Sequence, residues 1–179
     1  MKKPELLAPA GSFEKAKVAF MYGADAVYCG TASLSLRSRA EVDDNDLEKT
    51  IKYAHSIGKK VYAALNIYAW DTNYEEIEKQ VKMLDEVHVD AIIASDGGVI
   101  QKIREIAPNI EIHVSTQANV VSYHAAKFWY DNGAKRVILG RETSKDQIQE
   151  IMKNKPEDLE VEMFIHGALC WAYSGRCFL

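Results

Sequence analysis

Three short stretches of this chain repeat one pattern, a turn followed by an apolar run. Residues 22–27 read Tyr-Gly-Ala-Asp-Ala-Val, residues 87–92 read Val-His-Val-Asp-Ala-Ile, and residues 132–137 read Asn-Gly-Ala-Lys-Arg-Val. Each stretch places a short turn between the end of a helical pattern and the start of an apolar strand. This is the helix-to-strand joint of a repeating β/α unit, so the pattern predicts a fold built from such units.

Strand and helix patterns alternate along the chain on both sides of these joints. Near-continuous apolar runs are typical of parallel strands buried on both faces, and they predict seven strands at residues 5–8, 26–29, 60–65, 91–94, 111–114, 136–139 and 161–165. Amphipathic patterns predict helices at residues 13–22, 45–57, 74–87, 99–107, 123–132 and 144–153. Helix starts and ends carry the expected capping residues, which are Ser12, Asp43 or Asp44, Thr143, Gly23, Gly58 and Gly133.

Strict alternation of this kind predicts an α/β fold, a (β/α) TIM-type barrel of about seven parallel strands that is incomplete at its C-terminus. A doubly wound open sheet is the main alternative. No Gly-x-Gly-x-x-Gly motif follows the first strand, which weakens the dinucleotide-binding form of that alternative. We expect residues 1–179 to form one barrel domain and to be a fragment of a longer protein, because the chain stops within a group of cysteines.

Composition and charge restrict the class of protein. The chain has 179 residues, of which 47% are apolar and 27% charged, and this suits one globular domain with a substantial core. A formal charge of −4 gives no broad basic surface for nucleic acid. No signal peptide or membrane-spanning stretch is evident, and three cysteines fit poorly with a disulfide scaffold. These features predict a cytoplasmic protein with no membrane partner, and they leave its oligomeric state unknown.

Chemically useful side chains follow the predicted strands at their carboxyl ends, where (β/α)-barrel enzymes place their active sites. Asn66 follows the third strand, Ser115 and Gln117 the fifth, Arg141 the sixth and His166 the seventh. Because these polar residues are concentrated at one end of the predicted strands, the sequence predicts an enzyme. Each polar residue has a structural alternative, which is to satisfy loop backbone groups. By the same reasoning we expect two further residues at this rim to be structural: Cys29 as a small buried hydrophobe and Asp96 as a helix cap.

Two further groups of residues suggest ligand binding. Arg37 and Arg39 lie in a long loop after the second strand, and paired arginines suit a carboxylate or a phosphate. Cys170 and Cys177 are soft ligands of the kind that zinc and iron–sulfur clusters select, but their spacing fixes no geometry and a four-ligand site needs two more donors. From these residues alone, metal ligation, structural burial and a redox role all remain open.

Several longer motifs resemble one known family. Residues 162–170 read Glu-Met-Phe-Ile-His-Gly-Ala-Leu-Cys, and residues 174–177 read Ser-Gly-Arg-Cys. These motifs closely resemble the signature of the collagenase-like peptidases of unknown type, family thirty-two. Further agreement comes from residues 5–11, 23–28, 35–40, 113–119 and 136–142, so the resemblance covers the whole chain.

The resemblance implies two different activities. The family is named for proteolysis, yet the chain has neither a Gly-x-Ser-x-Gly elbow nor a His-Glu-x-x-His helix. Other relatives hydroxylate a wobble uridine of tRNA, a cytidine of rRNA or the ubiquinone ring. Some of them use prephenate, and the quinone enzymes carry a four-iron, four-sulfur cluster. By this similarity Cys170 and Cys177 are expected to be two of four cluster ligands, with the others beyond Leu179 unless Cys29 or a partner supplies them.

The hypothesis that we carry forward is an iron–sulfur-dependent tRNA uridine hydroxylase with prephenate as a small carboxylate co-substrate. In it Glu162, His166, Asn66 and Gln117 orient substrate or move protons. Substrate-binding roles go to Arg37, Arg39, Ser115 and Arg141, with RNA bound through the full-length protein. The alternatives are a metal-dependent collagenase-like peptidase, and a barrel that acts only as a scaffold or binding subunit.

Overall fold

The computed structural model describes residues 3–31, 34, 41–167 and 174. Its strands are β1 (Leu7–Pro9), β2 (Ala26–Thr31), β3 (Glu41–Val42), β4 (Lys60–Ala64), β5 (Ala91–Ala94), β6 (Glu111–Val114), β7 (Arg136–Ile138) and β8 (Glu160–Glu162). Its helices are α1 (Phe13–Met21), α2 (Asp44–Ser56), α3 (Tyr74–Glu86), α4 (Gly97–Ile106), α5 (Tyr123–Asp131) and α6 (Lys145–Asn154), with two 3₁₀ turns, η1 (Asp71–Asn73) and η2 (Thr116–Ala118). Within these described residues, no helix is long and apolar enough to cross a membrane.

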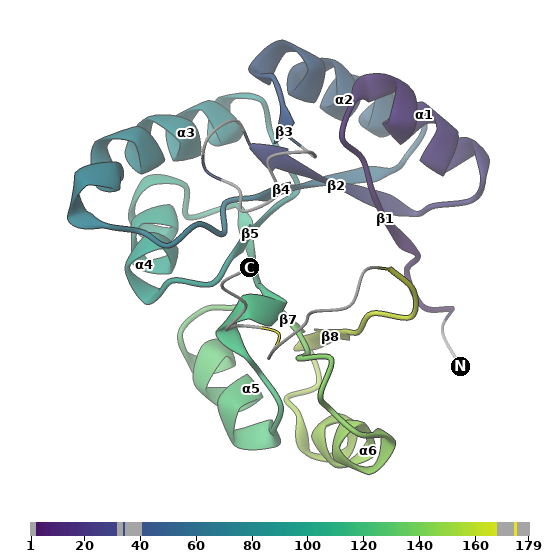
Figure 1. Ribbon diagram of the computed structural model, residues 1–179, viewed down its shortest axis with the longest axis vertical. Coiled ribbons are helices and arrows are strands. Elements are labelled where there is room, and N and C mark those ends of the chain that lie inside the picture. The colour runs from purple at the N-terminus through teal and green to yellow at the C-terminus, as the bar shows by residue number, and fades with distance from the viewer. Residues whose placement is uncertain (1–2, 32–33, 35–40, 168–173, 175–179) are drawn as a thin grey trace.

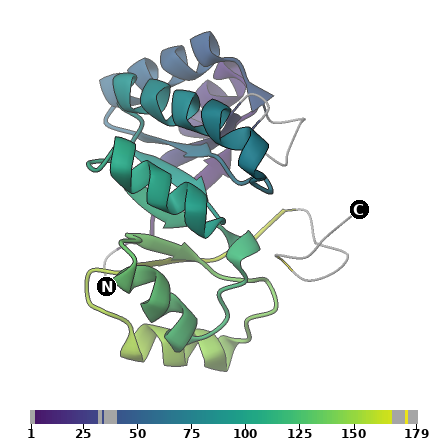
Figure 2. The same cartoon turned by 90° about the vertical axis from the view of Figure 1, so that its left-hand side faces the viewer.

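The strands pair in parallel and in chain order, as β1-β2-β4-β5-β6-β7-β8, and the two-residue β3 joins β2 from outside this path. The sheet curves into an open ring with the helices around its outer side (Figures 1 and 2). The edge strands β1 and β8 do not pair with each other in the described part of the chain. The prediction of a TIM-barrel-like fold with about seven parallel strands is therefore confirmed. The doubly wound alternative is wrong, because the strand order never reverses.

Alternation along each strand divides the core into two layers. Val27, Val61, Ile92 and Val137 belong to the larger layer, which packs between the sheet and the helices. The smaller layer faces the inside of the ring and contains Ala26, Tyr62, Ala64, Ala91, Ile93 and Ile138. Three of these six residues are alanines, so the inner face is filled less completely and leaves room for a pocket.

Local capping explains where most helices begin. Ser12 accepts a hydrogen bond from the Lys15 amide at 3.2 Å, and Asp43 accepts one from the Asp46 amide at 2.8 Å, as predicted. The predicted cap of the last helix, Thr143, is wrong by one residue. Ser144 caps α6 in a capping box, because its amide donates to Gln147 Oε1 at 2.8 Å while its hydroxyl accepts from the Gln147 amide.

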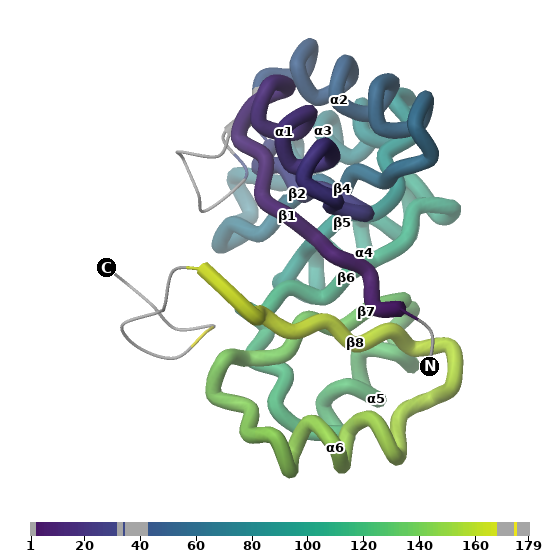
Figure 3. Tube along the Cα trace, turned by 90° about the vertical axis from the view of Figure 1, so that its right-hand side faces the viewer, coloured from purple at the N-terminus to yellow at the C-terminus, as the bar shows by residue number. Residues whose placement is uncertain are grey.

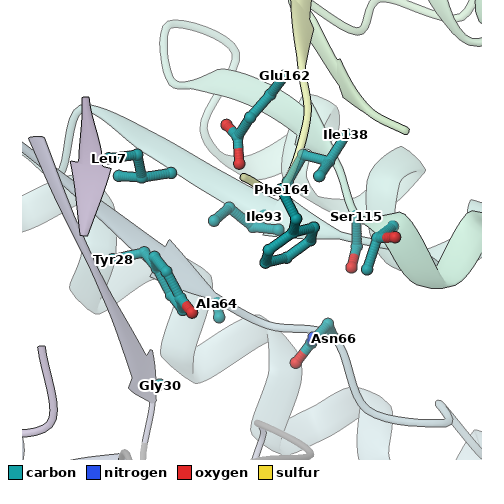
Figure 4. A pocket seen from close by; sticks show the side chains of 11 residues that line it. Leu7, Tyr28, Gly30, Ala64, Asn66, Ile93, Ser115, Ile138, Glu162 and Phe164 are labelled. Carbon is teal, nitrogen blue, oxygen red and sulfur yellow. The ribbon is translucent and has the colours of Figure 1, made fainter. Parts of the chain in front are cut away.

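The last strand is shorter than the predicted 161–165 because its partner ends first. Ile138 is the final residue of β7, and it pairs with Glu162. Beyond this pair the chain leaves the ladder, which frees Phe164 to lie inside the curve of the sheet (Figure 4). The short β3 was not predicted, since two residues carry too little pattern to mark a strand.

Asp96 is the cap of α4, as expected from the sequence, and not an acid of the pocket. Its Oδ1 accepts hydrogen bonds from the amides of Gly98 at 2.9 Å and Val99 at 3.0 Å. We expect Asp96→Ala to lower the free energy of unfolding by about 1 kcal/mol, since two amides lose their acceptor. Urea denaturation followed by circular dichroism measures this change. Asp85→Ala, at an exposed position of α3, should change it by less than about 0.5 kcal/mol; equal effects would contradict the capping role.

Candidate active site

One pocket opens at the carboxyl ends of the strands, inside the curve of the sheet (Figure 4). Asn66 follows β4, Ser115 follows β6 and Glu162 ends β8, and all three line this pocket. Aromatic and aliphatic side chains form most of the remaining wall, which consists of Leu7, Tyr28, Gly30, Ala64, Ile93, Thr116, Ile138 and Phe164. The pocket is open to solvent, and about 530 Å³ of empty space, part of it outside the protein surface, lies between these side chains.

The two-residue period of the strands explains why these side chains meet. On β4, Tyr62 and Ala64 face inward, and Asn66 continues this face beyond the end of the strand. On β6 the same face carries His113 and then Ser115. Parallel pairing aligns the carboxyl ends of neighbouring strands, so polar residues placed there converge on one mouth.

A buried arginine lies beneath the pocket and binds three carboxylates. Arg136, the first residue of β7, is 6% exposed. Its guanidinium donates to Glu5 at 2.8 Å, to Glu160 at 2.5 Å and to Glu162 at 3.2 Å. Tyr62 donates its hydroxyl to Glu5 at 2.9 Å. We call Arg136 and these three glutamates the Arg136 cluster; it contains one cation for three acidic groups.

The cluster affects two of its carboxyl groups in opposite directions. Burial raises the pKa of Glu162, and the charge and hydrogen bond of Arg136 offset only part of the rise. Burial also raises the pKa of Glu5, but hydrogen bonds from Arg136 and Tyr62 outweigh it, so that the net shift is downward. Glu162 is therefore the group of this pair that holds a proton more readily, and it is the one that lines the pocket.

His113 lies on β6 beside this cluster and is fully buried. Its ring meets the Tyr62 ring edge to face, with centroids 4.6 Å apart. Neither ring nitrogen makes a hydrogen bond with a described residue, although Glu111 Oε2 lies 3.5 Å from Nε2. Burial lowers the pKa of His113, which keeps the ring neutral and gives the Arg136 cluster no second cation.

Three predicted site residues lie near the pocket without lining it. Gln117 belongs to η2, and its buried Oε1 accepts no hydrogen bond from a described residue. The guanidinium carbon of Arg141 lies 3.9 Å from the centroid of the Phe164 ring. His166 is exposed, two residues beyond Phe164. The structure thus brings Asn66, Ser115 and Glu162 together, and it places Gln117, Arg141 and His166 outside that group.

The predicted residues Arg37, Arg39, Cys170 and Cys177 lie outside the described residues. Among the described residues, no group of three or more His, Cys, Asp or Glu side chains is arranged to hold a metal ion. Cys29 is 1% exposed, and burial raises the pKa of its thiol to about 12. Cys29 packs in the hydrophobic core and is the small buried hydrophobe that the sequence predicted.

Sequence reasoning missed four residues that shape the pocket, namely Tyr28, Phe164, Arg136 and Glu5. The signal for Arg136 was present, because a charged residue that opens an otherwise apolar run of a buried strand needs partners. The two-residue period also places Glu160, Glu162 and Phe164 on one face of the chain. Which strands would supply the partners could not be predicted without the register.

Comparison with known proteins relates the chain to one family. The model of peptidase family U32 matches residues 11–179. The chain is 49% identical to tRNA hydroxylation protein P of Haemophilus influenzae over 178 residues, which cover 99% of this chain and 38% of that protein. It is 34% identical to a collagenase of Porphyromonas gingivalis, over 98% of this chain and 44% of that protein. The chain thus spans about two fifths of the length of these curated relatives.

A solved structure, that of the U32 peptidase Mk0906, shares the fold. It superposes with a TM-score of 0.70, covering 91% of this chain and 70% of that structure, at 14% sequence identity. At this identity the likeness supports the barrel architecture alone.

The raised pKa of Glu162 gives a test of the charge balance at the site. In the wild-type protein the unfolded carboxyl ionises near 4.5, whereas the folded one ionises at a higher pH. Between these values the folded state binds more protons, so wild-type stability falls as the pH rises. The Glu162→Gln variant has no carboxyl to ionise at this position, so its free energy of unfolding should not fall in this way. We therefore expect its free energy of unfolding, measured by urea titration, to increase relative to that of the wild type from pH 4 to pH 7.

Glu5→Gln is the matched control, because the pKa of Glu5 is lowered in the same cluster. Its stability relative to wild type should decrease as the pH rises toward 4.5 and then stay constant. If both variants changed in the same direction with pH, the assignment of opposite shifts would be wrong.

Proposed function

Since the chain belongs to peptidase family U32, we propose that it is the barrel part of an RNA-hydroxylating enzyme that acts on a uridine of tRNA. The observation that carries this proposal is the 49% identity to a tRNA hydroxylation protein across 99% of the chain. The pocket supports an enzymatic role, because it combines apolar walls with a few convergent polar groups at the catalytic end of a (β/α) barrel.

In this proposal the pocket residues position the substrate and move protons. Glu162 is the candidate acid or base, since it lines the pocket and its pKa is raised by burial. Asn66 and Ser115 supply hydrogen bonds that orient the substrate. Arg141, together with Arg37 and Arg39, is proposed to bind the carboxylate co-substrate prephenate or an RNA phosphate.

The proposed cofactor is a four-iron, four-sulfur cluster that Cys170 and Cys177 help to hold in the full-length protein. When bound, such a cluster supplies electron-transfer or Lewis-acid chemistry that no side chain of the pocket provides. Ser174 lies between the two cysteines in the chain. Its hydroxyl accepts a hydrogen bond from the Arg141 amide at 2.9 Å, and its amide donates to Glu142 at 2.6 Å. These contacts hold Ser174 at the rim after β7.

A collagenase-like peptidase is the second candidate, and the 34% identity to a collagenase favours it. The identity to the collagenase is lower than that to the tRNA hydroxylation protein, over nearly the same share of the chain. The sequence also has neither a Gly-x-Ser-x-Gly elbow nor a His-Glu-x-x-His helix. Gelatin cleavage by the anaerobically purified full-length protein, lost in Glu162→Gln, would support this candidate against RNA hydroxylation.

The proposed function predicts a large effect of Glu162→Gln on RNA modification. In cells that lack the native gene, we expect full-length protein with this change to form hydroxylated uridine at a rate at least about 100-fold lower, because proton transfer is lost. Mass spectrometry of tRNA nucleosides after induction measures the rate. Glu157→Gln, at an exposed loop position, should behave as wild type. Unchanged hydroxylated uridine in cells without the protein would rule out the proposal.

If Cys170 and Cys177 bind the proposed cluster, replacing them should remove its iron, whereas replacing Cys29 should not. Full-length protein purified without oxygen should contain iron and sulfide and absorb visible light. Cys170→Ser combined with Cys177→Ser should lose all three signals, because two of four thiolate ligands are removed. Cys29→Ala should keep them, since this thiol is buried in the core. Retention of iron and sulfide in the double variant would contradict the ligand assignment.

A further inference from the structure

We infer that the pocket receives an uncharged planar ring, the base of the nucleotide that is modified, and that it excludes the carboxylate co-substrate. This inference rests on the proposed function and goes further by assigning one of two substrates to this pocket. Three observations carry it: the charges around the pocket, the orientation of Phe164, and the polar groups at the rim.

The charges oppose an anionic ligand. Glu162 is the one charged side chain among the described residues that line the pocket. Of the described cations beside the pocket, Arg136 lies below it and already contacts Glu5, Glu160 and Glu162, and Arg141 lies on one face of the Phe164 ring. Even with Glu162 protonated, the remaining two carboxylates exceed the single guanidinium of Arg136. A carboxylate in the pocket would therefore lose its water, and the described cation beneath it, Arg136, is already shared among three acidic groups.

Phe164 is placed to contact a flat ring. The guanidinium carbon of Arg141 lies 3.9 Å from its centroid, which is too close for an approach along the ring edge, so the cation covers one face. The ring must then meet the pocket with its edge or its other face. Tyr28 lines the same pocket from β2, and Leu7, Ile93 and Ile138 supply apolar surface (Figure 4). Aromatic and aliphatic walls of this kind hold a base that has left its stack.

Polar groups at the rim match the edge of a base. The base-pairing edge of uracil presents one N–H donor with a carbonyl acceptor on each side. The Asn66 amide can donate and accept hydrogen bonds, and so can the Ser115 hydroxyl. The Glu162 carboxyl accepts a hydrogen bond when it is ionised and can donate one when it is protonated. An uncharged edge can pair with these groups in either state of Glu162. The target base must leave its stack to reach them, so the RNA segment bound here is single-stranded or has this base flipped out of a duplex.

The test compares two short single-stranded RNAs bound to the full-length protein. One contains a single uridine, and the other has an abasic nucleotide in its place and keeps every phosphate. By fluorescence anisotropy we expect the uridine RNA to bind at least about fivefold more tightly, because stacking of one base contributes that much. Millimolar prephenate should leave this ratio unchanged. Equal affinities in the wild-type protein, or loss of the ratio with prephenate, would overturn the inference.

Variants locate the effect in the pocket. Phe164→Ala should bring the two affinities together, while Phe164→Tyr should keep the difference because the ring remains. The matched control is Phe128→Ala, which removes an exposed phenylalanine of α5 outside the pocket and should not change the ratio. A ratio that survives in folded Phe164→Ala would also overturn the assignment. The wild-type comparison decides the question even if that variant does not fold.

The outcome separates this inference from the proposed function. If hydroxylated uridine in cells depends on the protein but both RNAs bind equally, the pocket assignment fails and the proposed function stands. If the uridine RNA binds more tightly but no hydroxylated uridine depends on the protein, the proposed function fails and the base-binding pocket stands.

Discussion

The guanidinium of Arg136 joins the two edges of this sheet in the described part of the chain. β1 and β8 are edge strands, and the described residues form no ladder between them. Arg136 on β7 reaches Glu160 and Glu162 on β8, and also Glu5, which precedes β1 and is 131 residues away in the chain. Figure 3 shows β1 and β8 approaching each other near the N-terminus. Loss of the arginine would leave Glu162 buried without its cation, a costly state in a protein interior.

The same contact determines the chemistry of the pocket. Because Arg136 binds the Glu162 carboxyl from below, this group is fixed at the pocket floor. Its cation is shared among three acids, so burial still raises the pKa of Glu162. The pocket above therefore has apolar walls and one carboxyl that can hold a proton, and the lining residues that the structure describes carry no positive charge. An uncharged ring suits these conditions better than an anion does.

The family relation and the fold contribute differently to the function. A (β/α) barrel hosts many unrelated reactions, so the likeness to a solved U32 peptidase at 14% identity defines the architecture and no chemistry. The relatives with higher identity include a tRNA hydroxylation protein and a collagenase, and this chain spans about two fifths of each.

The sequence by itself determined which segments form helices, which form strands, and in what order they follow one another. Apolar runs such as Ala91–Ala94 and joints such as Gly133 depend on local backbone preferences and on a short repeat, so their positions agree with the structure to within a few residues. Asn66, Ser115 and Glu162 could be predicted to share one rim, because parallel strands end on the same side. Only the tertiary structure decided that Arg136 meets Glu5, that Phe164 turns inward, and that Gln117 and His166 lie outside the pocket. These outcomes depend on strand register and on where each ladder ends, which are set by contacts between residues far apart in the chain.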